Sequence, residues 1–385
     1  MQFMDVGLLI NNNSSGNPYR LAELGSTWAA ARRRPYQAGG LTHQRLRENI
    51  NSDLWLTVIR RMLRMNELLT GAVATGLMLL SGANVAQSSP PPSTAMAGMQ
   101  QAFAAYHKMP DTRGSGHFPA LKEANPAFPG HVVYRPADLT GLGKRKLPIV
   151  LWGNGGCTDD GASERLFLEE IASYGYLVLA PGTIQSGPGA PPAPVPAPQA
   201  PGTLSVRTTT DQVHQGLDQA VAANGMPGQW HDRLDLDRVA VGGYSCGGLQ
   251  ALAIAADPRI KAVVITHSGI FKEGGNPIKG MQIDKSALEK LHTPVIYILG
   301  GKSDIAYPNG TDDYARIHQV PVFMASHDVG HGGTFFKPNG GAEAQVVRTW
   351  LDWQLRKDGS AAKMFEGQHC GLCEKPGWTI ASKGF

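Results

Sequence analysis

A serine set among glycines carries the clearest chemical signal in the chain. The heptapeptide GGYSCGG at residues 242–248 follows an apolar run typical of a strand (DRVAV) and precedes one typical of a helix (LQALAIAA). A serine on such a sharp strand-to-helix turn holds a strained backbone and presents its hydroxyl above the sheet, and Gly243 and Gly247 leave room for the chain to fold on itself. The motif predicts that Ser245 is a nucleophile, with an ordinary glycine turn as the alternative.

A serine nucleophile needs a general base, and the base needs a carboxylate to orient it. Asp304 follows the strand-like run PVIYIL, and His331 follows the strand-like run VPVFMA. The order Ser, Asp, His leaves steps of 59 and 27 residues, each long enough for a helix and a strand. Because parallel strands end at the same edge of a sheet, we expect Ser245, Asp304 and His331 to meet there.

Other titratable residues compete for these roles. His327 lies four residues before His331, a spacing that would suggest a metal pair on a helix, but both residues follow a strand. We therefore expect His327 to cap the strand end. Asp312 and Asp313 are acids in the same interval as Asp304 but fall inside the next expected helix.

The negative charge that develops in acyl transfer needs amide donors. The amide after the nucleophile, that of Cys246, is one candidate. The loop GNGGCT at residues 153–158, after the strand-like run LPIVLW, offers a second from Gly156 or Cys157, because glycines let backbone amides face the site. A flexible connector between strand and helix is the alternative for this loop.

Strand-like and helix-like segments alternate through the second part of the chain. Helical periodicity appears at 163–174 and 342–356. The strand candidates are 131–135, 147–152, 176–180, 237–242, 260–266, 294–299 and 320–325. Several are continuous β-branched runs, which are typical of strands covered on both faces. The pattern predicts an α/β fold with a mainly parallel twisted sheet flanked by helices, in one catalytic domain over 116–358.

The N-terminal part differs in charge and composition. Residues 1–70 hold nine arginines, no lysine and five acids, so they carry the whole net charge of +4 of the 385-residue chain. The residues after position 70 carry equal numbers of basic and acidic side chains, which disfavours a protein that binds nucleic acid through its phosphates. Three arginines, a 13-residue apolar run and small residues predict a signal peptide at 62–86, with a buried helix as the alternative. We expect a non-globular extension at 1–61, a Pro/Ser linker with the start of the mature chain at 87–115, and a secreted or periplasmic protein without a membrane anchor after cleavage.

The four cysteines, at 157, 246, 370 and 373, agree with export to an oxidising compartment. Four cysteines allow three pairings, and spacing alone does not choose among them. Cys370 and Cys373 are close enough in sequence to bond to each other and to clamp a C-terminal tail at 359–385. Together with His369 they fall short of a four-ligand zinc site.

The order, spacing and context of these motifs resemble the α/β-hydrolase superfamily from about residue 120 to residue 357. Within it the chain is most similar to esterases with little or no lid: dienelactone-hydrolase-like, cutinase-like and polyester-hydrolase-like enzymes. The resemblance implies a serine carboxylic-ester hydrolase that works through an acyl-enzyme without cofactor or metal, with oxyanion donors at Cys246 and Cys157. The chain departs from relatives with His-Gly in the oxyanion loop, and from dienelactone hydrolases proper, which use a cysteine nucleophile.

Two further expectations follow from the resemblance. If Cys157 and Cys246 both border the oxyanion hole, their sulfur atoms are placed to form a disulfide, with two buried thiols as the alternative. The lid position of the family, here Ser268 to Thr293, spans only 26 residues, so we expect a minimal lid and an open site. We expect a monomer acting on small or polymeric esters. A peptidase or amidase of the same fold and a non-catalytic binding protein remain alternatives.

Overall fold

The computed structural model describes residues 105–191, 204–272 and 275–385. The expected extension at 1–61 and signal peptide at 62–86 lie outside the described residues, as do residues 87–104 of the expected linker. Within the described residues, no helix combines the length and apolar character needed to cross a bilayer.

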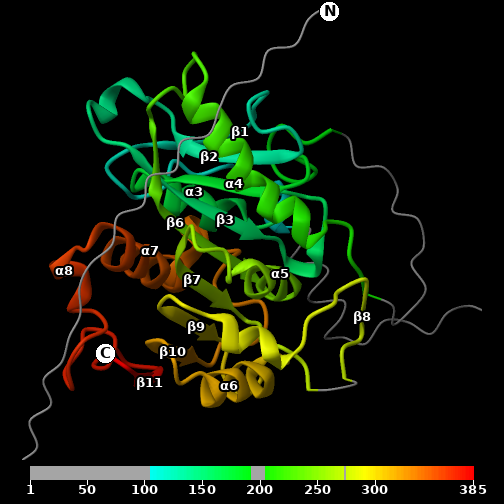
Figure 1. The fold of residues 1–385 in the computed structure, drawn as a ribbon, viewed down its shortest axis with the longest axis vertical. Coiled ribbons are helices and arrows are strands. Elements are labelled where there is room, and N and C mark those ends of the chain that lie inside the picture. The colour runs from blue at the N-terminus through cyan, green and yellow to red at the C-terminus, as the bar shows by residue number, and fades with distance from the viewer. Residues whose placement is uncertain (1–104, 192–203, 273–274) are drawn as a thin grey trace, which may run out of the picture. The chain divides into compact units, whose positions relative to one another are not determined.

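A nine-stranded sheet organises the described part of the chain in the order β1-β2-β4-β3-β6-β7-β9-β10-β11 (Figure 1). The six strands from β4 to β10 in this order pair in parallel, and β1, β2 and β11 extend the two edges antiparallel. The strands are β1 (Ala120–Ala124), β2 (His131–Pro136), β3 (Leu147–Gly153), β4 (Leu177–Pro181), β6 (Leu234–Tyr244), β7 (Ile260–Thr266), β9 (Val295–Leu299), β10 (Val322–His327) and β11 (Trp378–Lys383). A separate two-stranded sheet pairs β5 (Leu204–Ser205) with β8 (Ile278–Lys279).

Helices cover both faces of the large sheet. The α-helices are α3 (Arg165–Ser173), α4 (Thr210–Gly225), α5 (Cys246–Ile254), α6 (Tyr307–Arg316), α7 (Gly341–Arg356) and α8 (Gly359–Ala362). Short 3₁₀ helices lie at η1 (Thr140–Leu142), η2 (Gly155–Cys157), η3 (Lys285–Lys290) and η4 (Pro338–Gly340). This is the mainly parallel sheet flanked by helices that the sequence predicted.

The two apolar cores explain why the central strands are continuous hydrophobic runs. In β3, Ile149 and Leu151 pack with residues of α4 and α5, whereas Val150 and Trp152 pack with residues of α3 and α7. Alternate side chains of one strand therefore enter opposite cores, and both faces require apolar residues.

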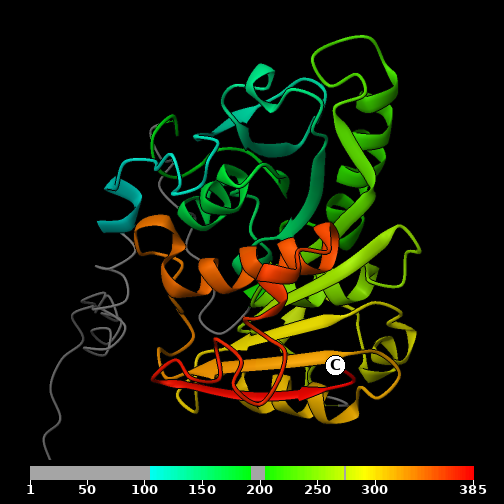
Figure 2. The same cartoon turned by 90° about the vertical axis from the view of Figure 1, so that its left-hand side faces the viewer.

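The two ends of the fold include residues that the sequence placed in a linker and a tail. Residues 359–385 include α8 and β11, and β11 pairs with β10 over six residue pairs. Figure 2 shows β11, in red, along the lower edge of the sheet. The catalytic sheet therefore extends beyond residue 358. The sequence of β11, WTIASK, is short and mixes polar and apolar residues, because an antiparallel edge strand is not covered on both faces. The same reason explains why β1 was not predicted.

Candidate active site

The carboxyl ends of five parallel strands place polar side chains along one edge of the sheet. Ser245 follows β6, His267 follows β7, and Asp304 and His331 lie in the loops after β9 and β10. The loop that contains η2 follows β3. Side chains that lie up to 86 residues apart in sequence are thereby brought to one place.

The turn at Ser245 has the strained geometry that the glycine pattern predicted. Ser245 adopts φ +53° and ψ −119° and directly precedes α5. A β-carbon at Gly247 would lie 2.0 Å from the carbonyl oxygen of Gly153, and one at Gly243 would lie 2.3 Å from that of Gly247. Since such contacts are shorter than any side chain tolerates, only glycine lets β3, β6 and α5 approach this closely.

Ser245, His331 and Asp304 form a continuous hydrogen-bonded chain. The Oγ of Ser245 lies 2.9 Å from Nε2 of His331, and Nδ1 of His331 lies 2.7 Å from Oδ1 of Asp304. The Asp304 side chain is fully buried, whereas that of His331 is 26% exposed. Because the carboxylate accepts from Nδ1, it selects the tautomer whose Nε2 can accept the serine proton.

Asp304 has a second histidine partner that sequence reasoning missed. Nδ1 of His267 donates to Oδ2 of Asp304 at 2.8 Å, and the amides of Gly300 and Ala306 donate to the same carboxylate. Burial alone would raise the pKa of Asp304, but the hydrogen bonds from His267 and His331 hold it well below its usual range. The signal available in sequence was a histidine directly after a buried strand that ends at the same edge.

His267 lies between two buried carboxylates. Its Nε2 donates to Oε1 of Glu343 at 3.1 Å, and the same oxygen accepts from Nε2 of His327 at 3.2 Å. Burial would lower the pKa of His267, but the charge and hydrogen bond of Glu343, with those of Asp304, raise it to about 9. A positively charged His267 therefore compensates two negative charges that have little contact with water.

The residues that competed for the triad have other partners. His327 ends β10, stacks on Trp378 of β11 with ring centroids 4.2 Å apart, and reaches Glu343 rather than Ser245. Asp312 and Asp313 lie in α6, as expected, where both form ion pairs with Lys285. Asp313 also accepts hydrogen bonds from the amide of Ile270 and the hydroxyl of Tyr297, so its partners are not Ser245 or His331.

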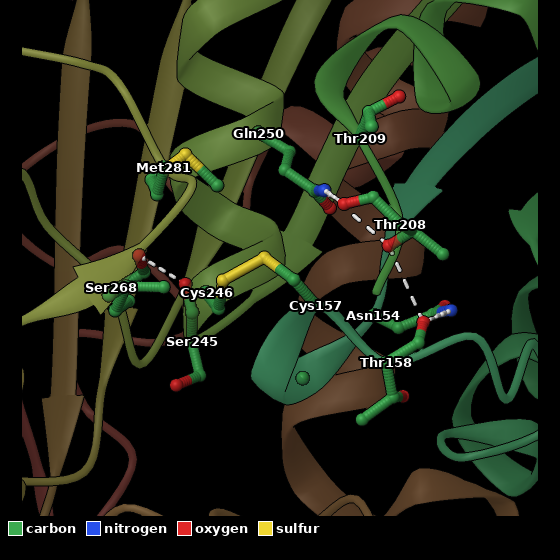
Figure 3. The surroundings of a disulfide bond; sticks show 12 residues. Asn154, Cys157, Thr158, Thr208, Thr209, Ser245, Cys246, Gln250, Ser268 and Met281 are labelled. Carbon is green, nitrogen blue, oxygen red and sulfur yellow. Dashed lines mark hydrogen bonds between the residues drawn. A yellow bond between two sulfur atoms is a disulfide. The ribbon is translucent and has the colours of Figure 1, made fainter. Parts of the chain in front are cut away.

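The loop after β3 is joined covalently to the turn at the nucleophile. The sulfur atoms of Cys157 and Cys246 form a disulfide, and Figure 3 shows the bond linking this loop to the start of α5 beside Ser245. A second disulfide joins Cys370 and Cys373, and both cysteine pairs are those that the sequence analysis considered. No cysteine in the chain is free.

One of the three expected amide donors is occupied. The amide of Cys157 donates to the carbonyl oxygen of Asn154 at 3.0 Å, because the loop turns tightly with Cys157 at φ +48°. Cys157 is also completely buried, so the expectation that its amide faces the site is corrected. Gly156 is partly exposed and lines the pocket at Ser245, and Cys246 is the first residue of α5, whose initial amides have no partner within the helix.

A pocket of about 600 Å³ opens beside Ser245 and His331. Its lining includes the aromatic residues Tyr106, Tyr244 and Phe336, residues of the η2 loop, and the acidic residues Asp160 and Glu164. Tyr106 belongs to the segment that the sequence assigned to a linker, so part of the pocket wall lies outside the expected catalytic domain. The described residues contain no group of three or more His, Cys, Asp or Glu side chains placed to hold a metal ion.

Comparison with known proteins adds one finding. A family model described as the dienelactone hydrolase family matches residues 149–354, which is more than half of the chain. The match runs from β3 to α7 and includes Ser245, His267, Asp304 and His331. No curated protein matches the chain.

Proposed function

The chain belongs to the dienelactone hydrolase family of α/β hydrolases, and we propose that it is a serine carboxylic-ester hydrolase that works through an acyl-enzyme. The observation that carries this proposal is the hydrogen-bonded chain from Ser245 Oγ through His331 to Asp304, with links of 2.9 Å and 2.7 Å. It combines a nucleophile, a general base and an orienting carboxylate at the mouth of a pocket.

The proposed reaction begins when Ser245 Oγ attacks the ester carbonyl carbon and His331 Nε2 takes the hydroxyl proton. The resulting imidazolium is stabilised by Asp304, which stays ionised because its pKa is held low. His331 then protonates the leaving alcohol, and the acyl group remains on Ser245. A water molecule, deprotonated by His331, attacks the acyl-enzyme and releases the acid, which restores the free serine.

The tetrahedral oxyanion needs donors in place before the reaction. We assign them to the amides of Cys246 and Gly156, which flank Ser245 from α5 and from the η2 loop. The Cys157–Cys246 disulfide joins these two segments, so the separation between the two donors is restrained by a covalent bond. Preorganised donors avoid the reorganisation that water would need around the new charge.

Hydrolysis of 4-nitrophenyl acetate, butyrate and octanoate by the full chain and by Ser245→Ala tests the proposal. Removal of the nucleophile should lower kcat by about 10⁴-fold or more. A 4-nitroanilide of the same acyl group separates the alternatives, because an amidase would cleave it at a rate comparable with the ester. Equal ester turnover by both proteins would indicate a non-catalytic binding protein.

We also propose that the protein is exported and that its disulfides form after export. Two disulfides within the described residues, one of them buried beside the nucleophile, support an oxidising compartment. Mass analysis of protein recovered from the periplasm or medium should find an N-terminus at Asn84 or Gln87, after the expected leader. Full-length protein with reduced cysteines inside the cell would contradict this.

A further inference from the structure

The pocket beside Ser245 is lined by both aromatic and acidic side chains, and this combination determines which esters it accepts. We infer that the pocket selects uncharged esters with an aromatic or compact apolar group and rejects esters that carry a carboxylate. This inference rests on the proposed function and deepens it, because it names the substrate class. It is carried by three observations: an aromatic wall, two acidic side chains in the same lining, and a buried hydroxyl without a partner.

The aromatic wall comes from three separate segments of the chain. The rings of Tyr106 and Phe336 meet edge to face with centroids 4.7 Å apart, and the ring of Tyr244 lies 5.5 Å from that of His331. Burial raises the pKa of Tyr106 and of Tyr244 above the usual range, so both rings stay neutral. Flat, neutral rings beside the nucleophile favour an aromatic or apolar substrate group over a hydrated charged one.

The lining also carries two acidic side chains, Asp160 and Glu164, with no lysine or arginine among the lining residues within the described part of the chain. The Arg165 guanidinium lies 4.3 Å from the centroid of the Tyr106 ring, where it binds Asp111 and backbone carbonyls rather than the pocket. A carboxylate on the substrate would therefore meet like charge in a region of low dielectric constant.

A buried hydroxyl of the lining offers a hydrogen bond without charge. The Oγ1 of Thr158 is buried and has no hydrogen-bond partner in the described part of the chain, and Thr158 lines the pocket. Buried hydroxyls normally have partners, so this one is the group that an uncharged substrate oxygen would satisfy.

Glu164 makes the charge of the pocket depend on pH. It is 2% exposed and accepts from Gly155, Ser163 and Trp152. The titratable groups that act on it are Asp160 from its own loop, Tyr106, Tyr134 of β2 and Tyr244 of β6. Burial raises the pKa of Glu164 to about 7 despite its hydrogen bonds, so the pocket gains a second negative charge as the pH rises through neutrality.

Two isosteric esters test the inference without changing substrate shape. The acetate esters of 4-nitrophenol bearing a carboxamide or a carboxylate at the 3-position have nearly the same shape and differ in charge, and both release a coloured phenol; dividing each kcat/KM by the alkaline hydrolysis rate of the same ester removes the difference between the leaving groups. The ratio of kcat/KM for carboxamide over carboxylate should be about tenfold or more. It should rise severalfold between pH 6 and pH 8.5, because Glu164 ionises in that range. The pair of 4-nitrophenyl hexanoate and 4-nitrophenyl hydrogen adipate places the charge on the acyl side.

Matched variants locate the charge that acts. Glu164→Gln should lower the ratio and remove its rise with pH, whereas His107→Gln, at another titratable residue of the lining, should leave that rise in place. Asp160→Asn should lower the ratio at both pH values. If Glu164→Gln does not fold, the Asp160→Asn result still decides whether wall charge excludes the anion.

Binding separates this inference from the proposed function. Calorimetric titration of Ser245→Ala, which lacks the nucleophile, with the two intact esters measures selectivity for charge without turnover, and the carboxamide should bind about tenfold more tightly. Active protein with a ratio near one, or with a preference for the carboxylate, would overturn the inference and leave the esterase proposal standing. A protein that turns over neither ester but binds the carboxamide preferentially would overturn the esterase proposal alone.

Discussion

Nδ1 of His267 lies 2.8 Å from Oδ2 of Asp304, and the other oxygen of this carboxylate accepts a hydrogen bond from Nδ1 of His331. Asp304 is therefore held on both sides by imidazoles, and the second imidazole is itself anchored to Glu343. His267 does not line the pocket, so we regard it as a positioning residue that fixes the orientation and the ionised state of Asp304.

Replacement of His267 by glutamine should destabilise the protein and alter its pH–rate profile. Loss of the buried positive charge leaves Asp304 and Glu343 uncompensated, which should cost about 3–5 kcal/mol in the free energy of unfolding. The pKa of Asp304 should rise, so the acid limb of kcat/KM should move to higher pH. Urea denaturation and pH–rate measurements check both effects.

The variant His327→Gln is the matched control, because His327 contacts Glu343 but not Asp304. It should leave the acid limb in place. The double variant His267→Gln/Glu343→Gln should lose less stability than the sum of the two single variants, since it removes a charge of each sign. Additive losses and an unchanged acid limb in His267→Gln would show that His267 has no role at Asp304.

Stability should fall with rising pH in two separate windows. The folded-state pKa of His267, about 9, lies above the unfolded value of about 6.5. The stabilisation that protonated His267 gives the folded state is therefore complete below pH 6.5 and is lost as the pH rises through 9. Glu164 has a folded-state pKa of about 7 against about 4.3 unfolded, so its contribution is lost between those values. Thermal denaturation at half-unit pH steps should show a flatter lower window in Glu164→Gln and a flatter upper window in His267→Gln. Loss of the same window in both variants would contradict these assignments.

Removal of the Asp304 charge should reduce turnover far more than substrate binding. In Asp304→Asn a neutral amide replaces the carboxylate. It no longer selects the tautomer of His331 or stabilises its imidazolium, so kcat should fall about 10³–10⁴-fold with KM little changed. The neighbouring acid variant Asp312→Asn, which weakens partly exposed ion pairs with Arg316 and Lys285, should retain activity. Steady-state kinetics on 4-nitrophenyl butyrate compare the two, and equal losses would point to a general effect on folding.

The two disulfides should differ in their importance. Cys157 and Cys246 are separated by 89 residues, so removing this bond as Cys157→Ala/Cys246→Ala should cost about 2–5 kcal/mol of stability. It should also lower kcat, because the Gly156 amide loses its covalent restraint. The Cys370–Cys373 disulfide joins residues that are only three positions apart, so the variant Cys370→Ala/Cys373→Ala should leave kcat unchanged. Full activity of the first pair would show that the bond does not hold the oxyanion donors.

The parts of the fold that follow from local sequence were predictable. The segment from β6 through Ser245 into α5 is fixed by a buried apolar run, glycines where backbones touch, and a helical run. The same is true of the central strands, because a strand covered on both faces is apolar throughout. The family match to residues 149–354 covers this predictable part.

The parts that depend on distant contacts were not predictable. His267 belongs to no motif, and its partner Glu343 lies 76 residues later on α7. Tyr106 lines the pocket, and it is held by contacts with Arg165 of α3, which binds its carbonyl oxygen and packs on its ring. The choice between Gly156 and Cys157 as amide donor required the tight turn in which Cys157 donates to Asn154.

Covalent trapping of the nucleophile tests the central claim most directly. The full chain and Ser245→Ala are treated with a fluorophosphonate, and intact mass and peptide mapping then identify the modified residue. We predict one adduct per chain, located on Ser245 and lost in Ser245→Ala, with activity disappearing in proportion to labelling. An adduct on another residue, or ester turnover that persists in fully labelled protein, would contradict it.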